Sequence, residues 1–512
     1  MHAEPGRVLL VTGRLAKEQV YAAALSAGGG KKGIAQSREG GTVRAGADVL
    51  VADVDVAAFI TPGMLRQAAP QGYDLILIPG SVTADFGQVE AELKTPIRLG
   101  PKHAADIKFV LDHLHEYELS TTVPACVLMQ GRMRRDALSQ VERLEDQAPW
   151  LMKIRGRKVG GGSRMKVLAE IVDAARLPPA ALAGKISYYE EQGADMIDLG
   201  LSLDSSPEQV EEAVRLARRA TDLPVSIDTL RPDLILAGIR AGADLVASLD
   251  GSNLPLVGEA VAHAGLPAVV ISGPGPVSLE ENLAQALSLG ISAIADPVLE
   301  PPLLGLAASL QKYLLFHELH PETPIFFGAG NVTELLDADT GGVNALLASL
   351  AAEVGGSILF TPEYSAKATG SVRELAAASR MMLLAASRHT PPKDLGLDML
   401  VLKEKRRLAD EAAPAEAIDA EAGTDRLHRF IEDGAGSFRI FITGDRVVAE
   451  NGDIAISGRS AKSILATIID RELVSRLDHA GYLGRELERA ETALRLKRGY
   501  IQDEPLWPAE KS

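Results

Sequence analysis

The sequence contains almost no cysteine. Cys126 is the only one among 512 residues, which excludes an intramolecular disulfide framework and a zinc site built from several cysteines. A chain without disulfides is typical of a reducing compartment, so we expect a cytoplasmic protein. Cys126 lies in the apolar run Val123–Met129, where we expect a buried structural thiol rather than a nucleophile.

Long hydrophobic runs and excess positive charge are also missing. No apolar stretch reaches the roughly 18 residues that span a bilayer, and Met1–Arg7 lacks the form of a signal peptide. Lys and Arg number 53 against 69 Asp and Glu, a formal net charge of −16. The missing apolar run predicts that the protein does not bind a membrane. Because nucleic-acid phosphates are held by clustered cations, we also expect no nucleic-acid partner. A small anionic substrate is not excluded.

The length of the chain indicates several domains. Residues 1–158 alternate short apolar runs with helical patterns, which predicts an N-terminal α/β domain with a parallel sheet. The block 164–388 carries a longer repeat, and 389–425 is a Pro-, Ala- and Glu-rich linker. Residues 426–512 start with strand patterns and continue with long amphipathic helical patterns, which predicts a small C-terminal α+β domain.

The central block repeats one unit, a short β-type run followed by a helical pattern, eight times. Eight such units fit the ~250 residues typical of a (β/α)8 TIM barrel, and their regularity favours a closed barrel over the alternative, a doubly wound open sheet. The predicted strands are Lys166–Glu170, Met196–Leu199, Pro224–Ile227, Leu245–Ser248, Ala268–Ile271, Ser292–Ala295, Pro324–Phe327 and Ser357–Phe360.

Polar side chains stand where the predicted barrel strands end, which is where barrel enzymes assemble their active sites. Such a rim of carboxylates and amides suits a nitrogen-rich heterocycle, whose N–H groups a carboxylate can accept in pairs. It contains neither a His cluster for zinc nor a Ser-His-Asp arrangement. The candidate residues are Glu170, Asp198, Asp228, Ser248, Asp250, Asn253, Asp296, Asn331 and Lys367.

Several of these candidates also have a structural interpretation. Asp228 could cap the following helix, although the repeated strand pattern around it favours a functional role. Asp296 precedes a proline, as in a common turn. The structural alternative stays open for Glu170, Asp198, Asn331 and Lys367.

Three segments of the central block resemble dihydropteroate synthases. Gly193–Gly200, Val225–Thr229 and Ala295–Pro297 are similar to that family's second, third and sixth strand motifs. More closely, the chain resembles the dihydropteroate synthase-like proteins of methanogens and methylotrophs that are associated with tetrahydromethanopterin. Leu99–Asp106 and Ser475–Glu486 look like signatures of the flanking regions of that group.

The resemblance implies a transferase that condenses a dihydropterin-methyl diphosphate with an arylamine. In the tetrahydromethanopterin pathway, the arylamine would be a ribofuranosyl-aminobenzene phosphate. Asp296 would then hold the amino-pyrimidinone edge of the pterin, and Asp228 would stabilise positive charge as diphosphate leaves. The resemblance also implies an anion site assisted by Mg²⁺ and basic groups. Gly328–Gly330 and Gly370-Ser371 are the loops that could bind the phosphate of the acceptor.

The chain departs from the synthase pattern mainly where diphosphate would bind. Glu170–Asp173 replaces the first-strand Asn motif, and Ser248, Asp250 or Asn253 must substitute for the Asn-Asp of the fourth strand. Gly328–Thr333 replaces the Ser-Arg-Lys motif after strand seven, and the Arg-x-His pair of strand eight is absent. Pterin recognition is less affected by these departures.

Two alternative functions follow. Gly330-Asn331-Val332 resembles a loop of pterin-dependent methyltransferases, which implies methyl transfer with a corrinoid partner. A non-catalytic pterin-binding assembly subunit is the third hypothesis.

The Arg-, Glu- and Leu-rich pattern Glu472–Leu496 predicts a packing and homo-oligomer surface.

Overall fold

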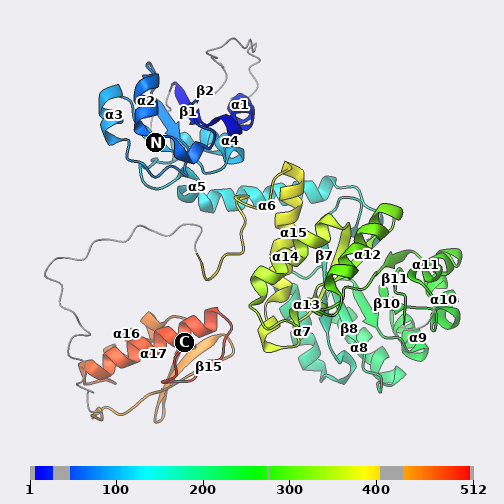
Figure 1. Ribbon diagram of the computed structural model, residues 1–512. Helices are drawn as coiled ribbons and strands as arrows, with labels where there is room; N and C mark the ends of the chain where they lie inside the picture. Colours follow the sequence, from blue (N-terminus) through cyan, green and yellow to red (C-terminus); the bar gives the residue numbers. More distant parts are fainter. Residues whose placement is uncertain (1–5, 27–46, 274–276, 404–430, 508–512) are drawn as a thin grey trace. The chain divides into compact units, whose positions relative to one another are not determined.

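The computed structural model describes residues 6–26, 47–273, 277–403 and 431–507. The chain separates into two compact units, Met1–Glu404 and Lys405–Ser512 (Figure 1). The first unit contains a small parallel sheet and a closed barrel, and the second contains an antiparallel sheet with two helices. The part of the proposed linker that covers 404–425 lies outside the described residues, and the domain limits at 158, 388 and 425 remain predictions. None of the described helices is long and apolar enough to cross a membrane.

The sheet at the start of the first unit has the strand order β2-β1-β3-β4, and all its strands are parallel. Its alternating residues enter two cores, with Val8 and Leu10 in one and Leu9 and Val11 in the other. Burial on both faces is what a parallel sheet requires. The strands are β1 Val8–Thr12, β2 Asp48–Val51, β3 Leu75–Ile78 and β4 Ile97–Leu99, and the larger helices are α1 Lys17–Ser26, α2 Pro62–Ala68, α3 Gly87–Leu93 and α4 Ile107–Asp112.

Cys126 lies in the short helix α5 (Ala125–Leu128) and is only partly buried. Desolvation raises the pKa of its thiol, so the reactive thiolate is disfavoured at neutral pH. The thiol is therefore less enclosed than the apolar run around it predicts, because the run folds as a helix with one face toward solvent.

The barrel is closed and all-parallel, in the order β10-β11-β12-β13-β14-β7-β8-β9, which confirms the predicted fold class. In Figure 1 the helices α8 to α12 lie outside these strands. The strands are β7 Lys166–Ile171, β8 Met196–Gly200, β9 Val225–Asp228, β10 Leu245–Leu249, β11 Ala268–Val270, β12 Ala293–Ala295, β13 Ile325–Gly328 and β14 Gly356–Pro362. The helices are α7 Pro179–Glu191, α8 Pro207–Ala220, α9 Pro232–Ala241, α10 Leu254–His263, α11 Leu279–Ser288, α12 Leu306–Leu319, α13 Gly330–Thr333, α14 Thr340–Glu353 and α15 Ser371–Arg388.

The barrel helices begin at clear sequence signals. Ser206 and Gln209 form a reciprocal capping box at α8, and Ser278 and Glu281 form another at α11. These pairs satisfy backbone N–H groups that have no partner within a first helical turn. The buried face of α8 is the stripe Val210, Ala213, Val214 and Ala217.

A hairpin fills the amino end of the barrel. It consists of β5 (Met152–Ile154) and β6 (Arg157–Val159), and follows helix α6 (Gln130–Gln147). Ile154 and Val159 are buried against inward-facing residues of the barrel. The next segment turns through three glycines with positive φ, and a Cβ on Gly161 would lie 2.7 Å from the Cα of Trp150. This segment is therefore a tight turn.

The second unit packs a three-stranded antiparallel sheet against two helices, as the predicted α+β class requires. Its elements are β15 Arg439–Thr443, β16 Arg446–Asn451, β17 Ile454–Gly458, α16 Ala461–Asp470 and α17 Leu477–Arg495. Asp433 accepts hydrogen bonds from the backbone N–H groups of Ser475 (3.0 Å) and Arg476 (3.1 Å) and contacts His479 Nδ1 at 3.0 Å. The Ser475 hydroxyl also donates to Asp433 and is the largest cause that lowers the pKa of this carboxyl group. Residues of the Ser475–Glu486 motif thus stabilise the start of α17.

Candidate active site

Strand register brings three carboxyl groups together at the carboxyl end of the barrel. Glu170 on β7 pairs in register with Asp198 on β8, and Gly200 on β8 pairs with Asp228 on β9. Inward positions recur every second residue along a strand. Ser226, two residues before Asp228, therefore shares its face. The alternating apolar and polar residues of Val225–Asp228 already contain this signal.

Asp228 is held by Ser248 of the neighbouring strand β10. The Ser248 hydroxyl donates to Asp228 Oδ1 at 2.7 Å, and Ala247 is the register partner of Asp228. Burial raises the pKa of Asp228, and the bond from Ser248 opposes this by stabilising the charged form. Asp228 Oδ2 takes no hydrogen bond from the residues that the structure describes, so it is available to a ligand.

Asp198 is fully buried and is fixed in the same way. The Ser226 hydroxyl donates to its Oδ1, while its Oδ2 has no hydrogen-bond partner within the described ranges. Burial, followed by the charges of Asp228 and Glu170, raises the pKa of Asp198 well above its usual range. The protonated form of Asp198 is therefore favoured, and in that form the carboxyl group can donate a hydrogen bond as well as accept one.

Asp296 follows β12 and is anchored from a different element. Its Oδ1 accepts hydrogen bonds from the Val298 N–H at 2.8 Å and from the Tyr313 hydroxyl of α12 at 2.9 Å. Burial raises the pKa of Asp296 to about 6, although both hydrogen bonds act in the opposite direction. Tyr313 was not selected from the sequence, since its position in the middle of a helix gives no sign that it reaches a strand end.

Glu170 is half-buried, and burial is the largest cause that raises its pKa to about 7. The negative charges of Asp228, Glu334 and Asp173 act in the same direction. The carboxylate lies directly over Gly200, where an added Cβ would be 2.4 Å from Glu170 Oε1. Glycine at this position leaves the space that the carboxylate occupies.

Asp250 and Asn253 build the loop after β10. Asp250 Oδ1 accepts hydrogen bonds from the Ser252 N–H (2.8 Å), the Ser252 hydroxyl (2.6 Å) and the Asn253 N–H (3.1 Å). Asn253 accepts from the Asp250 N–H and donates to the Ser248 carbonyl, both at 3.0 Å. These contacts support Ser248, whose φ of 67° lies in the left-handed region. Both side chains therefore position a site residue.

Asn331 lies in the short helix α13 and Lys367 in the 3-10 helix Ala366–Ala368, and each side chain has a partner of its own. Asn331 is exposed and donates to the Leu299 carbonyl at 2.8 Å. Lys367 forms an ion pair with Asp337 at 2.8 Å, which lowers the pKa of Asp337. Among the described residues, neither side chain forms a hydrogen bond or ion pair with Glu170, Asp198, Asp228 or Asp296.

Carboxylates accept several of the N–H groups between β14 and the first turn of α15. Glu363 accepts from the Val372 N–H at the start of α15 (3.1 Å), and Glu334 accepts from the Tyr364 N–H at 2.9 Å. A phosphate at Gly370-Ser371 would compete with Glu363 for the same helix end.

The mouth of the barrel is thus strongly acidic. Within the described part of the chain, no Lys or Arg forms an ion pair with the four carboxyl groups of the mouth: Glu170, Asp198, Asp228 and Asp296. Nor do three His, Cys, Asp or Glu side chains of that part converge on one metal position. Mg²⁺ usually binds through one or two carboxylates together with substrate phosphates, so its participation stays a prediction. What the site offers is carboxyl groups that can pair with N–H donors.

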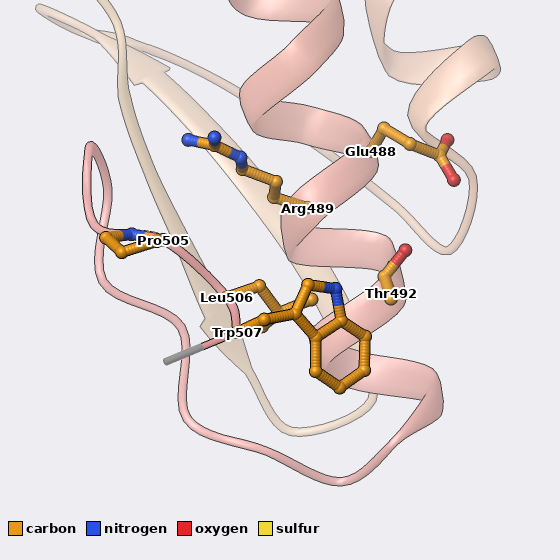
Figure 2. Close-up of a pocket in the computed structure, with 6 residues that line it drawn as sticks. All are labelled: Glu488, Arg489, Thr492, Pro505, Leu506 and Trp507. Carbon is orange, nitrogen blue, oxygen red and sulfur yellow. The ribbon is translucent and has the colours of Figure 1, made fainter. Parts of the chain in front are cut away.

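A separate pocket lies in the second unit (Figure 2). Its volume is about 220 Å³, and α17 and the segment after it line it with Glu488, Arg489, Thr492, Pro505, Leu506 and Trp507. None of the candidate residues of the barrel belongs to this pocket.

Two family models match parts of the chain. Residues 179–286 match the family described as Pterin binding enzyme, and residues 432–503 match the one described as PterinBD-DUF4346. An uncharacterized protein of Methanocaldococcus jannaschii is 35% identical over 491 residues, which cover 89% of this chain and 94% of the relative.

Solved dihydropteroate synthases share a lower similarity. The Xanthomonas albilineans enzyme in complex with 7,8-dihydropteroate is 21% identical, with 46% of this chain and 98% of that chain covered and a TM-score of 0.37. The Yersinia pestis enzyme with a pterine-sulfa conjugate is 20% identical, with 47% and 99% covered and a TM-score of 0.37.

Proposed function

Because the chain belongs to the same family as the Methanocaldococcus jannaschii protein and its barrel carries a Pterin binding enzyme domain, we propose that it is a pterin-dependent transferase. One arrangement at the barrel mouth carries this proposal. Asp198, Asp228 and Asp296 each have one oxygen fixed by a hydroxyl group, from Ser226, Ser248 and Tyr313 respectively. The second oxygen of each takes no donor from the described residues. Fixed carboxyl oxygens of this kind suit the several N–H groups of a pterin.

The reaction we propose is the condensation of a dihydropterin-methyl diphosphate with an arylamine. The arylamine would be a ribofuranosyl-aminobenzene phosphate, and the product would serve tetrahydromethanopterin biosynthesis. Asp296 holds the amino-pyrimidinone edge of the pterin, and Asp228 faces the ring and stabilises the positive charge that develops as diphosphate leaves. Asp198 and Ser248 complete the pterin side of the site, and Glu170 lies beside it as the register partner of Asp198.

The acidity of the mouth favours one second candidate, methyl transfer from a methylated pterin to a corrinoid partner. A methylated pterin carries no diphosphate group. Its reaction therefore releases no diphosphate and needs no cluster of cations to stabilise one. Methyl exchange that depends on added corrinoid protein would support this candidate, and complete indifference to corrinoid would exclude it.

Incubation of the purified protein with both condensation substrates tests the first proposal. Diphosphate release and a new carbon–nitrogen bond are the expected result. Absence of release over a range of Mg²⁺ concentrations would exclude the condensation, and tight pterin binding without turnover would indicate a binding subunit.

Asp296→Asn tests the pterin site directly. The amide places an N–H group where the carboxylate accepts one, and a hydrogen bond to a charged group contributes about 1.5–3 kcal/mol. We therefore expect dihydropterin affinity to fall by at least about tenfold in calorimetry, whereas the exposed Asp453→Asn leaves it unchanged. Equal binding by wild type and Asp296→Asn would refute this site.

A further inference from the structure

Glu170 differs from the other acids of the barrel mouth because no donor holds its carboxylate. Among the described residues, no hydrogen bond and no ion pair reaches either of its side-chain oxygens. Six other carboxyl groups at or near the strand ends accept hydrogen bonds from named partners: Asp198, Asp228, Asp250, Asp296, Glu334 and Glu363. Glu170 is therefore the acid with the most freedom to exchange a proton with a ligand.

The position of Glu170 places it beside the groups that the proposed function assigns to the pterin. Its register partner is Asp198, and Asp228 is the register partner of Gly200, over which Glu170 lies. The ionisable groups that interact with Glu170 are Asp173, Tyr189, Asp198, Asp228 and Glu334. The four acids among them come from four different segments of the barrel. Their negative charge stabilises the protonated form of Glu170.

We propose that Glu170 accepts the proton that the attacking amine loses in the condensation, an inference that rests on the proposed function. The amine nitrogen forms a bond to the methylene carbon of the pterin, and the bond from this carbon to the diphosphate oxygen breaks. Diphosphate leaves with the bonding electron pair. The proton of the resulting ammonium passes to the Glu170 carboxylate, which returns it to solvent after the product leaves.

The remaining carboxyl groups are poorly suited to this task. Asp228 and Asp296 are engaged with the ring in the proposed function. Asp198 is fully buried, its Oδ1 is held by the Ser226 hydroxyl, and burial with neighbouring negative charge disfavours its charged form. A base works best when its pKa lies near the working pH, and burial with neighbouring negative charge raises the pKa of Glu170 to about 7.

Glu170→Gln is the first test, with kcat/KM measured by diphosphate release between pH 5 and 9. Loss of a positioned base costs about 10²–10⁴-fold, so we expect a drop of at least about 100-fold and loss of the pH dependence near neutrality. Dihydropterin affinity in calorimetry stays within about threefold of wild type. The matched control is Glu318→Gln on the exposed face of α12, which leaves rate and pH profile unchanged.

Gly200→Ala is a second variant that keeps the carboxylate but moves it. The new Cβ would lie 2.4 Å from Glu170 Oε1, the far end of a flexible side chain that can rotate away. We expect the rate to fall and the pH profile to shift, while the fold is retained.

The outcomes separate this inference from the proposed function. If the wild type is active and Glu170→Gln has the same rate and pH profile, the inference is overturned and the proposed function stands. Loss of pterin binding in Glu170→Gln also overturns it, because Glu170 would then be a ring-binding residue. A wild type that releases no diphosphate overturns the proposed function and this inference together.

Discussion

Ser248 has a left-handed backbone conformation and donates a hydrogen bond to the carboxylate of Asp228. Its φ of 67° is unfavourable for serine and alanine alike, so Ser248→Ala removes the hydroxyl without changing the backbone preference. Loss of the 2.7 Å hydrogen bond raises the pKa of Asp228 further, since that bond stabilises the charged form. We expect dihydropterin affinity to fall about tenfold at pH 6 and less at pH 8, as measured by calorimetry. Ser288→Ala, on the exposed face of α11, should match wild type at both pH values.

Glu170 also makes the stability of the barrel depend on pH. Its pKa is raised from 4.5 to about 7, so between these values the folded protein holds a proton that the unfolded chain has released. Stability therefore falls as pH rises through this window. Glu170→Gln removes the buried charge, and we expect it to stabilise the protein by about 1–3 kcal/mol at pH 8 and by little at pH 4.5. Thermal unfolding at both pH values, with Glu318→Gln as control, checks the sign. A variant less stable than wild type at pH 8 would contradict it.

The sequence could reveal strand-end acids but not the contacts that hold them. Asp228 stands out because it ends an apolar run, and the alternation within that run also points to Ser226. Tyr313 carries no such signal, since its contact with Asp296 depends on how α12 packs against the barrel. Substrate binding by Asp250 and Asn253 stays a prediction. The bonds that these two residues make within the loop depend on a backbone turn that residue spacing does not specify.

Elements were predictable where an apolar run was long and bounded. All eight barrel strands lie within a few residues of their predicted limits, because strands buried on both faces are nearly continuous apolar runs. β4 has three residues with Arg98 in the middle, so it lacks such a run. β17 is an edge strand with mostly exposed residues, which leaves little hydrophobic signal.

The hairpin at the amino end of the barrel contributes to its stability through Ile154. This side chain is 1% exposed and belongs to the same buried cluster as Leu168, Met196 and Phe326. Ile154→Ala leaves a cavity in a closed layer, and such truncations cost about 2–5 kcal/mol. We expect a lower thermal unfolding temperature of the barrel, whereas the exposed Arg157→Ala on the same hairpin has little effect. Equal destabilisation by both variants would contradict the packing role of Ile154.

At the scale of the whole molecule, every residue assigned to the pterin site lies in the first compact unit, Met1–Glu404. We therefore expect a protein truncated after residue 404 to bind dihydropterin with an affinity within about threefold of the full chain. Calorimetry on both proteins measures this, with Asp296→Asn in the truncated protein as the negative control. Loss of binding on truncation would show that residues 405–512 contribute to the site.

The hairpin that fills the amino end of the barrel also has a kinetic consequence. With that end closed by Ile154 and Val159, substrates and products exchange through the same opening. An arylamine bound at the opening blocks the exit of a pterin bound deeper in the barrel. The proposed condensation should therefore follow an ordered sequence, in which the pterin enters before the arylamine, and an excess of arylamine should inhibit turnover by occupying the opening of the empty enzyme.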